Sequence, residues 1–125
     1  MDITPLIPAG RKLIQAYGGG GFRIAGTRHE GSVLVFPERV EAWPVESLAQ
    51  LTLESLAEVN KETPSVELLL IGCGARLPAI PFDLRRSLAG AGVAAEFMDT
   101  GAACRTFNVL LSEDRRAAAA LIAIG

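Results

Sequence analysis

The feature that most constrains the fold is a nearly continuous apolar run over residues 66–71, closed by Gly72-Cys73-Gly74. An apolar run of this length between turn residues is typical of a strand that is covered on both faces. Such a strand needs a further layer of structure on each side, because both rows of its side chains are withdrawn from water. The pattern therefore predicts a layered α/β domain with this strand at the centre of the sheet.

The residues after this run alternate between helix and strand patterns. Pro81 suits the first turn of a helix that Gly90 and Gly92 end, and residues 93–98 form the next predicted strand. A helix follows to about residue 112. The tail, 115–124, contains four consecutive alanines that favour a helix, but its last apolar residues favour a buried strand. We predict the strand, because it keeps the β-α-β alternation regular.

The first third of the chain reads as short strands separated by turn residues. The predicted strands are 13–18, 22–27, 33–36 and 39–43, and the predicted turns are 18–21, 28–31 and 37–38. This arrangement is a β-meander. A helix over about 52–61 follows, with Ser47 and Thr52 as candidate caps. The complete prediction is a single three-layer α/β domain, a β-meander plus β-α-β units around a central mixed sheet.

Composition limits the domain organisation and the partners. The chain has 125 residues, of which 50% are hydrophobic, and this length fits one domain over 1–125 with an extended segment at 1–10. Acidic residues outnumber basic ones by 14 to 12, which argues against nucleic acid as a partner. No signal sequence or membrane-spanning run is recognisable, so we expect a cytoplasmic protein.

Cofactor and metal chemistry have little support. One histidine and two cysteines cannot supply the paired ligands of a structural zinc site, and no cofactor is predicted. Gly72 and Gly74 follow a buried strand, where α/β sheets often bind ligands. They lack the third glycine and the acidic residue of a dinucleotide fingerprint, so a tight chain reversal is the alternative. The glycines at 18–21 precede a strand rather than a helix and are interpreted as a bend.

The most suggestive stretch runs from Asp99 to Asn108, where a strand ends and a helix begins. Free backbone N–H groups and the positive end of the helix dipole meet a thiol, Cys104, and a guanidinium, Arg105. Both features would lower the pKa of the thiol and make it a candidate nucleophile. Together with Thr100 and Thr106, these residues and the two glycines form the predicted ligand or partner site.

Each of these residues also has a structural interpretation. Cys104 shares a helical face with Phe107 and can be a small buried apolar residue. Asp99 can be a helix cap with no further role, and Asn108 can hydrogen-bond a neighbouring segment. His29 would have to reach across from a turn to pair with the thiol. No complete catalytic set is present. Arg85-Arg86 and Arg115-Arg116 either meet in an anion-binding patch or form solvated ion pairs.

Several motifs resemble those of a family of small bacterial and archaeal α/β proteins of unknown function that includes a mitochondrial complex I assembly factor. The motifs are Tyr17-Gly18, Phe22-Arg23-Ile24, Gly31-Ser32-Val33-Leu34-Val35, Trp43, Leu70-Ile71-Gly72 with Gly74 and, above all, the stretch from Glu96 through Leu110. The resemblance covers about residues 5–124. Relatives often carry threonine in place of Cys73 and tyrosine in place of Phe107, so a tyrosine hydroxyl is absent here.

The resemblance implies a three-layer fold with a mixed sheet and a non-enzymatic role. The mitochondrial relative binds another assembly factor and immature parts of the respiratory NADH dehydrogenase. By analogy, this chain is expected to be a bacterial protein-interaction or assembly factor whose partner is an assembly factor or a respiratory subunit. The alternative is an anion binder or a thiol-dependent enzyme that uses the helix start at Asp99–Asn108.

Overall fold

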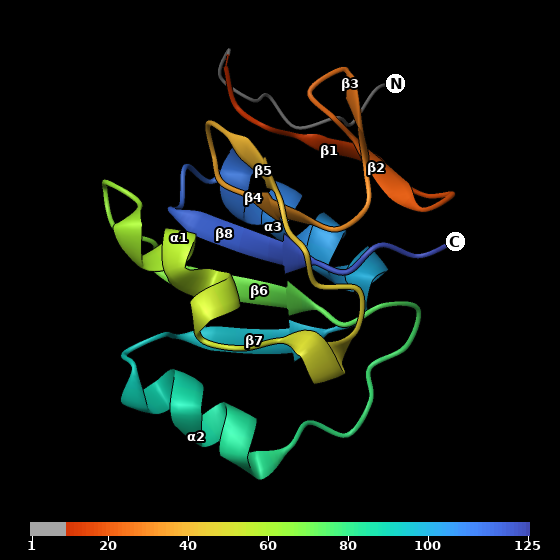
Figure 1. Cartoon of the computed structure of the whole chain (residues 1–125). Coiled ribbons are helices and arrows are strands. Elements are labelled where there is room, and N and C mark those ends of the chain that lie inside the picture. The colour runs from red at the N-terminus through yellow and green to blue at the C-terminus, as the bar shows by residue number, and fades with distance from the viewer. Residues whose placement is uncertain (1–9) are drawn as a thin grey trace.

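The computed structural model describes residues 10–125, so the predicted segment at 1–10 lies, except for its last residue, outside the described residues. Eight strands, two 3-10 helices and three α-helices make up this part of the chain (Figure 1). In order they are β1 Ile14–Gly18, β2 Gly21–Ile24, β3 Thr27–Glu30, β4 Val33–Val35, β5 Val40–Ala42, η1 Leu48–Gln50, η2 Glu54–Leu56, α1 Ala57–Lys61, β6 Leu68–Gly72, α2 Phe82–Gly90, β7 Ala95–Met98, α3 Thr100–Ser112 and β8 Ala117–Leu121.

A five-stranded mixed sheet forms the centre of the fold, with the strand order β5-β4-β8-β6-β7. β8 pairs antiparallel with β4 and parallel with β6, and β6 pairs parallel with β7. The prediction of a strand in the tail is therefore confirmed. The prediction that the 66–71 run lies at the centre is wrong by one position. β6 is an interior strand, but β8 takes the middle, because its alanines let layers pack closely on both faces.

The three N-terminal strands form a separate antiparallel sheet, β1-β2-β3. The predicted turn at 28–31 is wrong, because Arg28, His29 and Glu30 belong to β3 and pair with β2. The chain instead reverses at Ala25-Gly26, where φ is 49° and 85°. Positive φ at both central residues matches the twist of a two-residue hairpin. The predicted meander is thus divided, since β4 and β5 join the central sheet and β1–β3 do not.

Two layers cover the central sheet, which gives three layers in all (Figure 1). α3 and the β1–β3 sheet pack on one face, where Phe22, Phe107 and Leu70 are buried in one cluster. η1, η2, α1 and α2 pack on the other face, where Trp43, Ile71 and Leu88 share a second cluster. The two faces alternate along β8, as the two-residue period of a strand requires. The predicted fold class is confirmed.

The helical segments differ from the predictions mainly in their ends. The helix predicted over 52–61 is divided into η2 and α1, and the side-chain oxygen of Thr52 accepts a hydrogen bond from the Ser55 N–H at 3.1 Å. Ser47 makes no capping hydrogen bond, so its predicted role is wrong. α2 ends at Gly90 as predicted, but it begins at Phe82, and Pro81 is the N-cap residue rather than part of the first turn. Among the helices of residues 10–125, none has the length and apolarity to cross a membrane.

Candidate functional site

The start of α3 is the predicted site, and its cap is the one expected. The Asp99 carboxylate accepts a hydrogen bond from the Ala102 N–H at 2.8 Å. Aspartate is favoured here because it satisfies a free N–H group and carries negative charge at the positive end of the helix dipole. The Asp99 carboxylate therefore caps the helix, and the residue is only partly exposed.

Thr100 joins three segments in the interior and has no exposed surface. Its hydroxyl donates to the Ile122 carbonyl at 2.7 Å and accepts from the Gly74 N–H at 2.9 Å. Gly72 lies against the same residue, since an added Cβ would lie 3.0 Å from the Thr100 Cα and 3.1 Å from its hydroxyl oxygen. The predicted residues Gly72, Gly74 and Thr100 do come together, but they form a buried clamp between the ends of β6, β8 and α3. This clamp has no exposed cradle for a ligand.

Asn108 connects α3 to the separate sheet. Its side-chain oxygen accepts from the Ile14 N–H at 2.9 Å, and its amide nitrogen donates to the Ile14 carbonyl at 2.8 Å. The amide side chain thus pairs with β1 in the way that a neighbouring strand would, and both polar groups of Ile14 are satisfied. The structural interpretation of Asn108 is the one that the contacts support.

The interpretation of Cys104 as an activated nucleophile is wrong, and its interpretation as a small buried apolar residue is the one that the contacts support. The side chain is 3% exposed and packs in the cluster that contains Phe107. Burial raises the pKa of the Cys104 thiol from 9.0 to about 12, and this effect exceeds the opposing effect of Arg105. A thiol with this pKa stays protonated at neutral pH and is a poor nucleophile. His29 is not placed as a base for this thiol, since it lies in β3 opposite Phe22 of β2.

The exposed part of the site is an open hollow of about 390 Å³ between β1 and α3, and parts of Cys104 and Asn108 contribute to its lining. Arg105 and Tyr17 line it, with one guanidinium nitrogen 3.4 Å from the tyrosine hydroxyl. Gly101 lies against them, since an added Cβ would clash with the Tyr17 hydroxyl. Thr106 is partly exposed on the same helix. The predicted site residues missed Tyr17 and Gly101, although both belong to the motifs that carry the resemblance.

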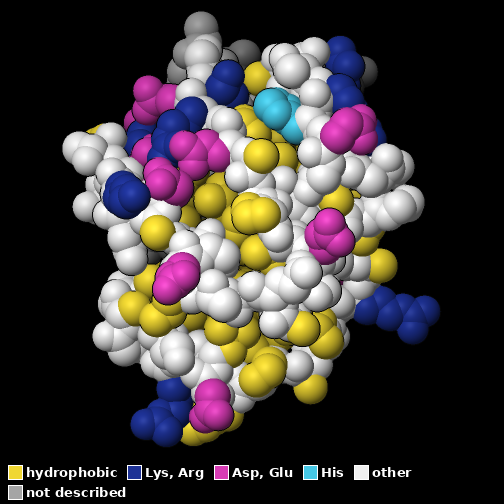
Figure 2. Space-filling model, in the orientation of Figure 1, with side chains coloured by type: hydrophobic (Ala, Val, Ile, Leu, Met, Phe, Trp, Pro, Cys, Tyr) yellow, Lys and Arg dark blue, Asp and Glu magenta, His cyan; other side chains and the backbone are white. Residues whose placement is uncertain are grey.

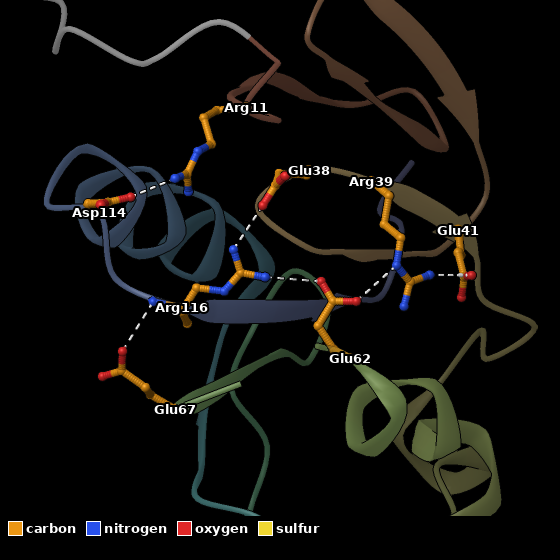
Figure 3. A network of polar contacts seen from close by, with 8 residues as sticks. All are labelled: Arg11, Glu38, Arg39, Glu41, Glu62, Glu67, Asp114 and Arg116. Carbon is orange, nitrogen blue, oxygen red and sulfur yellow. Dashed lines mark hydrogen bonds and ion pairs between the residues drawn. The ribbon is translucent and has the colours of Figure 1, made fainter. Parts of the chain in front are cut away.

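The two arginine pairs do not form a common patch. Arg116 pairs with Glu38 at 2.9 Å and with Glu62 at 3.3 Å, and Arg39 pairs with the same Glu62 at 3.1 Å (Figure 3). Figure 3 shows this network between the start of β8, the β4–β5 connection and the end of α1. Arg85, in contrast, lies on α2, over the ring of Phe97. The interpretation as a solvated ion pair therefore applies to Arg115, which pairs with Glu67 while both side chains are about half exposed. It does not apply to Arg116, because the side chains of Arg116 and Glu62 are only 18% and 10% exposed.

A metal centre has no ligand set in the part of the chain that the structure describes. Within residues 10–125, no three side chains of histidine, cysteine, aspartate or glutamate lie close enough together to hold an ion. The polar side chains exposed at the hollow are those of Arg105, Tyr17 and Gln15. These groups suit hydrogen bonding to a partner or an anion.

Comparison with known proteins identifies relatives over nearly the whole chain. A family model described as "Protein of unknown function (DUF498/DUF598)" matches residues 14–122. An uncharacterized protein of Rhodobacter capsulatus is 41% identical over 114 residues, which cover 91% of this chain and 86% of that protein. The NADH dehydrogenase (ubiquinone) 1 alpha subcomplex assembly factor 3 of Xenopus tropicalis is 38% identical over 110 residues, covering 88% of this chain and 60% of that protein.

A solved structure has the same fold. The crystal structure described as an outer membrane protein from Bartonella henselae superposes with a TM-score of 0.81 at 42% sequence identity, and the match covers 96% of this chain and 100% of that chain. The match thus spans about 60% of the length of the Xenopus assembly factor and the whole of the Bartonella chain in that crystal structure.

Proposed function

Because the chain belongs to the DUF498/DUF598 family of proteins of unknown function, we propose that it is a non-enzymatic interaction factor in respiratory NADH dehydrogenase biogenesis. The observation that carries this proposal is the 38% identity to a protein named as an NADH dehydrogenase assembly factor. The match covers only 60% of that protein, so the transfer concerns the shared domain and its surface. We also propose that the chain acts in the cytoplasm.

The side-chain contacts at the start of α3 support a binding role over a catalytic one. Thr100 and Asn108 use their hydrogen-bonding groups on the backbone of this chain, and the Cys104 thiol is buried with a raised pKa. Arg105, Thr106 and Tyr17 remain for contact with a partner. Arginine and tyrosine are enriched in the residues that dominate binding energy at protein interfaces.

The test is capture of partners with the full chain and with an Arg105→Glu variant. We expect subunits or assembly factors of the respiratory NADH dehydrogenase to be recovered by the wild-type chain and lost in the variant. Arg23→Glu is the matched control, because Arg23 is an exposed arginine on β2. Normal assembly of the respiratory complex in a deletion strain, with no respiratory protein captured, would contradict the proposal.

The hollow beside Arg105 supports a second candidate function, the binding of a small anion. An exposed guanidinium next to a tyrosine hydroxyl can hold a carboxylate or a phosphate. Calorimetric titration with inorganic phosphate and with a dicarboxylate separates the two functions. Binding that Arg105→Ala abolishes, together with an absence of protein partners, would favour the anion binder.

A further inference from the structure

A second exposed surface lies on the face of the central sheet opposite α3. It consists of the loop over residues 75–81 together with α2. Phe82 is 71% exposed and Leu77 is 51% exposed, although side chains of this size usually bury most of their area. In Figure 2 hydrophobic side chains gather in the lower part of the molecule, where Figure 1 places α2, and Lys or Arg side chains project at its edges. Apolar groups exposed together in this way are typical of interaction sites.

The charge of this surface is opposite to that of the rest of the chain. Residues 75–90 carry three arginines and one aspartate, a formal charge of +2, whereas the other residues carry nine basic and thirteen acidic side chains, a formal charge of −4. Arg76, Arg85 and Arg86 form no ion pair with any residue of the described chain, 10–125. Their positive charge is therefore available to an acidic partner.

The arginines are placed beside the apolar side chains rather than away from them. The Arg86 guanidinium lies 5.7 Å from the centre of the Phe82 ring, and the Arg85 guanidinium lies 5.1 Å from that of Phe97. A guanidinium group that lies over a ring in this way and forms no ion pair within residues 10–125 can still donate a pair of hydrogen bonds to a carboxylate. An acidic side chain bound there would have an apolar contact directly next to it.

The loop is also restricted before any partner binds. Pro78 and Pro81 fix φ at two of its positions, and α2 is held to the sheet through Leu88, which is 2% exposed. A restricted loop loses less conformational entropy on binding than a flexible one. This restriction supports a role in recognition for a loop that is otherwise exposed.

We propose that Arg76, Leu77, Phe82, Arg85 and Arg86 form a docking surface for a segment of a partner protein that carries aspartate or glutamate beside apolar side chains. We call these five residues the apolar-basic surface. The proposal rests on the proposed function only for the class of partner, a protein. Three arginines are fewer than the four to eight basic residues typical of clusters that bind anionic lipid, so a protein segment suits the surface better than a membrane does.

The test is a photocrosslinking amino acid placed at position 82 of the full chain in its native host, followed by mass spectrometry of the linked segment. The segment is expected to contain at least two acidic residues within about five positions of the link. Arg85→Glu combined with Arg86→Glu should lower the yield at least about tenfold, as expected for loss of close charge pairs. Arg23→Glu should leave it unchanged. A crosslinker at Glu113, the exposed C-cap of α3, measures random capture.

The captured segment then serves as a synthetic peptide in a binding assay. Phe82→Ala should weaken its affinity about 30-fold, the loss expected when a dominant interface side chain is truncated. Leu53→Ala is the matched control, since Leu53 is an exposed apolar side chain on another element. A change of less than about threefold in the Phe82 variant would overturn the proposal. The proposal would also be overturned if position 82 linked only to a second copy of this chain or only to lipid. Links at position 82 that are no more frequent than links at Glu113 would overturn it as well.

A crosslinker at Thr106 separates this inference from the proposed function. Capture of a respiratory protein at Thr106 with nothing at Phe82 would leave the proposed function in place and refute the apolar-basic surface. Capture at Phe82 of an acidic segment from a protein outside the respiratory complex, with nothing at Thr106, would support the apolar-basic surface and refute the proposed function.

Discussion

Thr100→Val is predicted to destabilise the protein more than Thr100→Ser, because the buried hydroxyl matters more than the buried methyl group. Valine has about the volume of threonine and carries a methyl group in place of the hydroxyl. The Gly74 N–H and the Ile122 carbonyl, at 2.9 and 2.7 Å from that hydroxyl, then lose this hydrogen-bond partner in the interior. Serine keeps the hydroxyl and loses one methyl group.

The two losses differ enough in size to be separated. Each buried polar group left without a partner costs about 1–3 kcal/mol, so about 3 kcal/mol is expected for the two groups in Thr100→Val. The methyl group lost in Thr100→Ser costs about 1 kcal/mol. A total stability of about 5–15 kcal/mol leaves both variants folded.

Urea unfolding, followed by the fluorescence of Trp43, measures the difference. Trp43 is the only tryptophan and is 3% exposed, so its emission reports loss of the core. With a slope of about 1.5 kcal/mol per molar urea, Thr100→Val should lower the midpoint by about 2 M and Thr100→Ser by less than about 1 M. Equal midpoints, or a more stable valine variant, would refute the reasoning that the hydroxyl holds the ends of β6, β8 and α3 together.

Three further predictions concern the same region. The Cys104 thiol should resist alkylation in the folded protein. The free energy of unfolding should fall between about pH 9 and 12, because in this range the thiol ionises in the unfolded chain but not in the folded chain. Cys104→Ala should reduce this fall in a pH series of urea titrations. Asn108→Ala should cost about 2–3 kcal/mol and speed hydrogen exchange at Ile14, whose N–H loses its partner; unchanged exchange there would contradict the assigned contact. Gly72→Ala should destabilise the protein by about 1–3 kcal/mol, because the added methyl group meets Thr100 and Leu121. Gly90→Ala, on α2 where an added Cβ meets nothing, should leave the stability unchanged or raise it, and urea unfolding measures both variants.

The order of helices and strands followed from local patterns in the sequence. Elements that depend on interactions within one segment can be predicted from spacing and residue type. Examples are the apolar run at β6, Pro81 before α2 and Asp99 at the start of α3. The hairpin at Ala25-Gly26 was missed because an alanine rarely adopts positive φ, and the pairing of β3 with β2 supplies the energy that holds it there.

The roles of the candidate residues depended on contacts between distant parts of the chain. The sequence placed Thr100, Cys104 and Asn108 together on one helix, and this grouping was sufficient to predict a site. Only the tertiary structure decided that the hydroxyl, the thiol and the amide turn toward the chain itself. Local spacing determines which residues share a helix. Burial depends instead on how the layers pack, and burial raises the pKa of the Cys104 thiol and leaves Thr100 and Asn108 hydrogen-bonded within the chain.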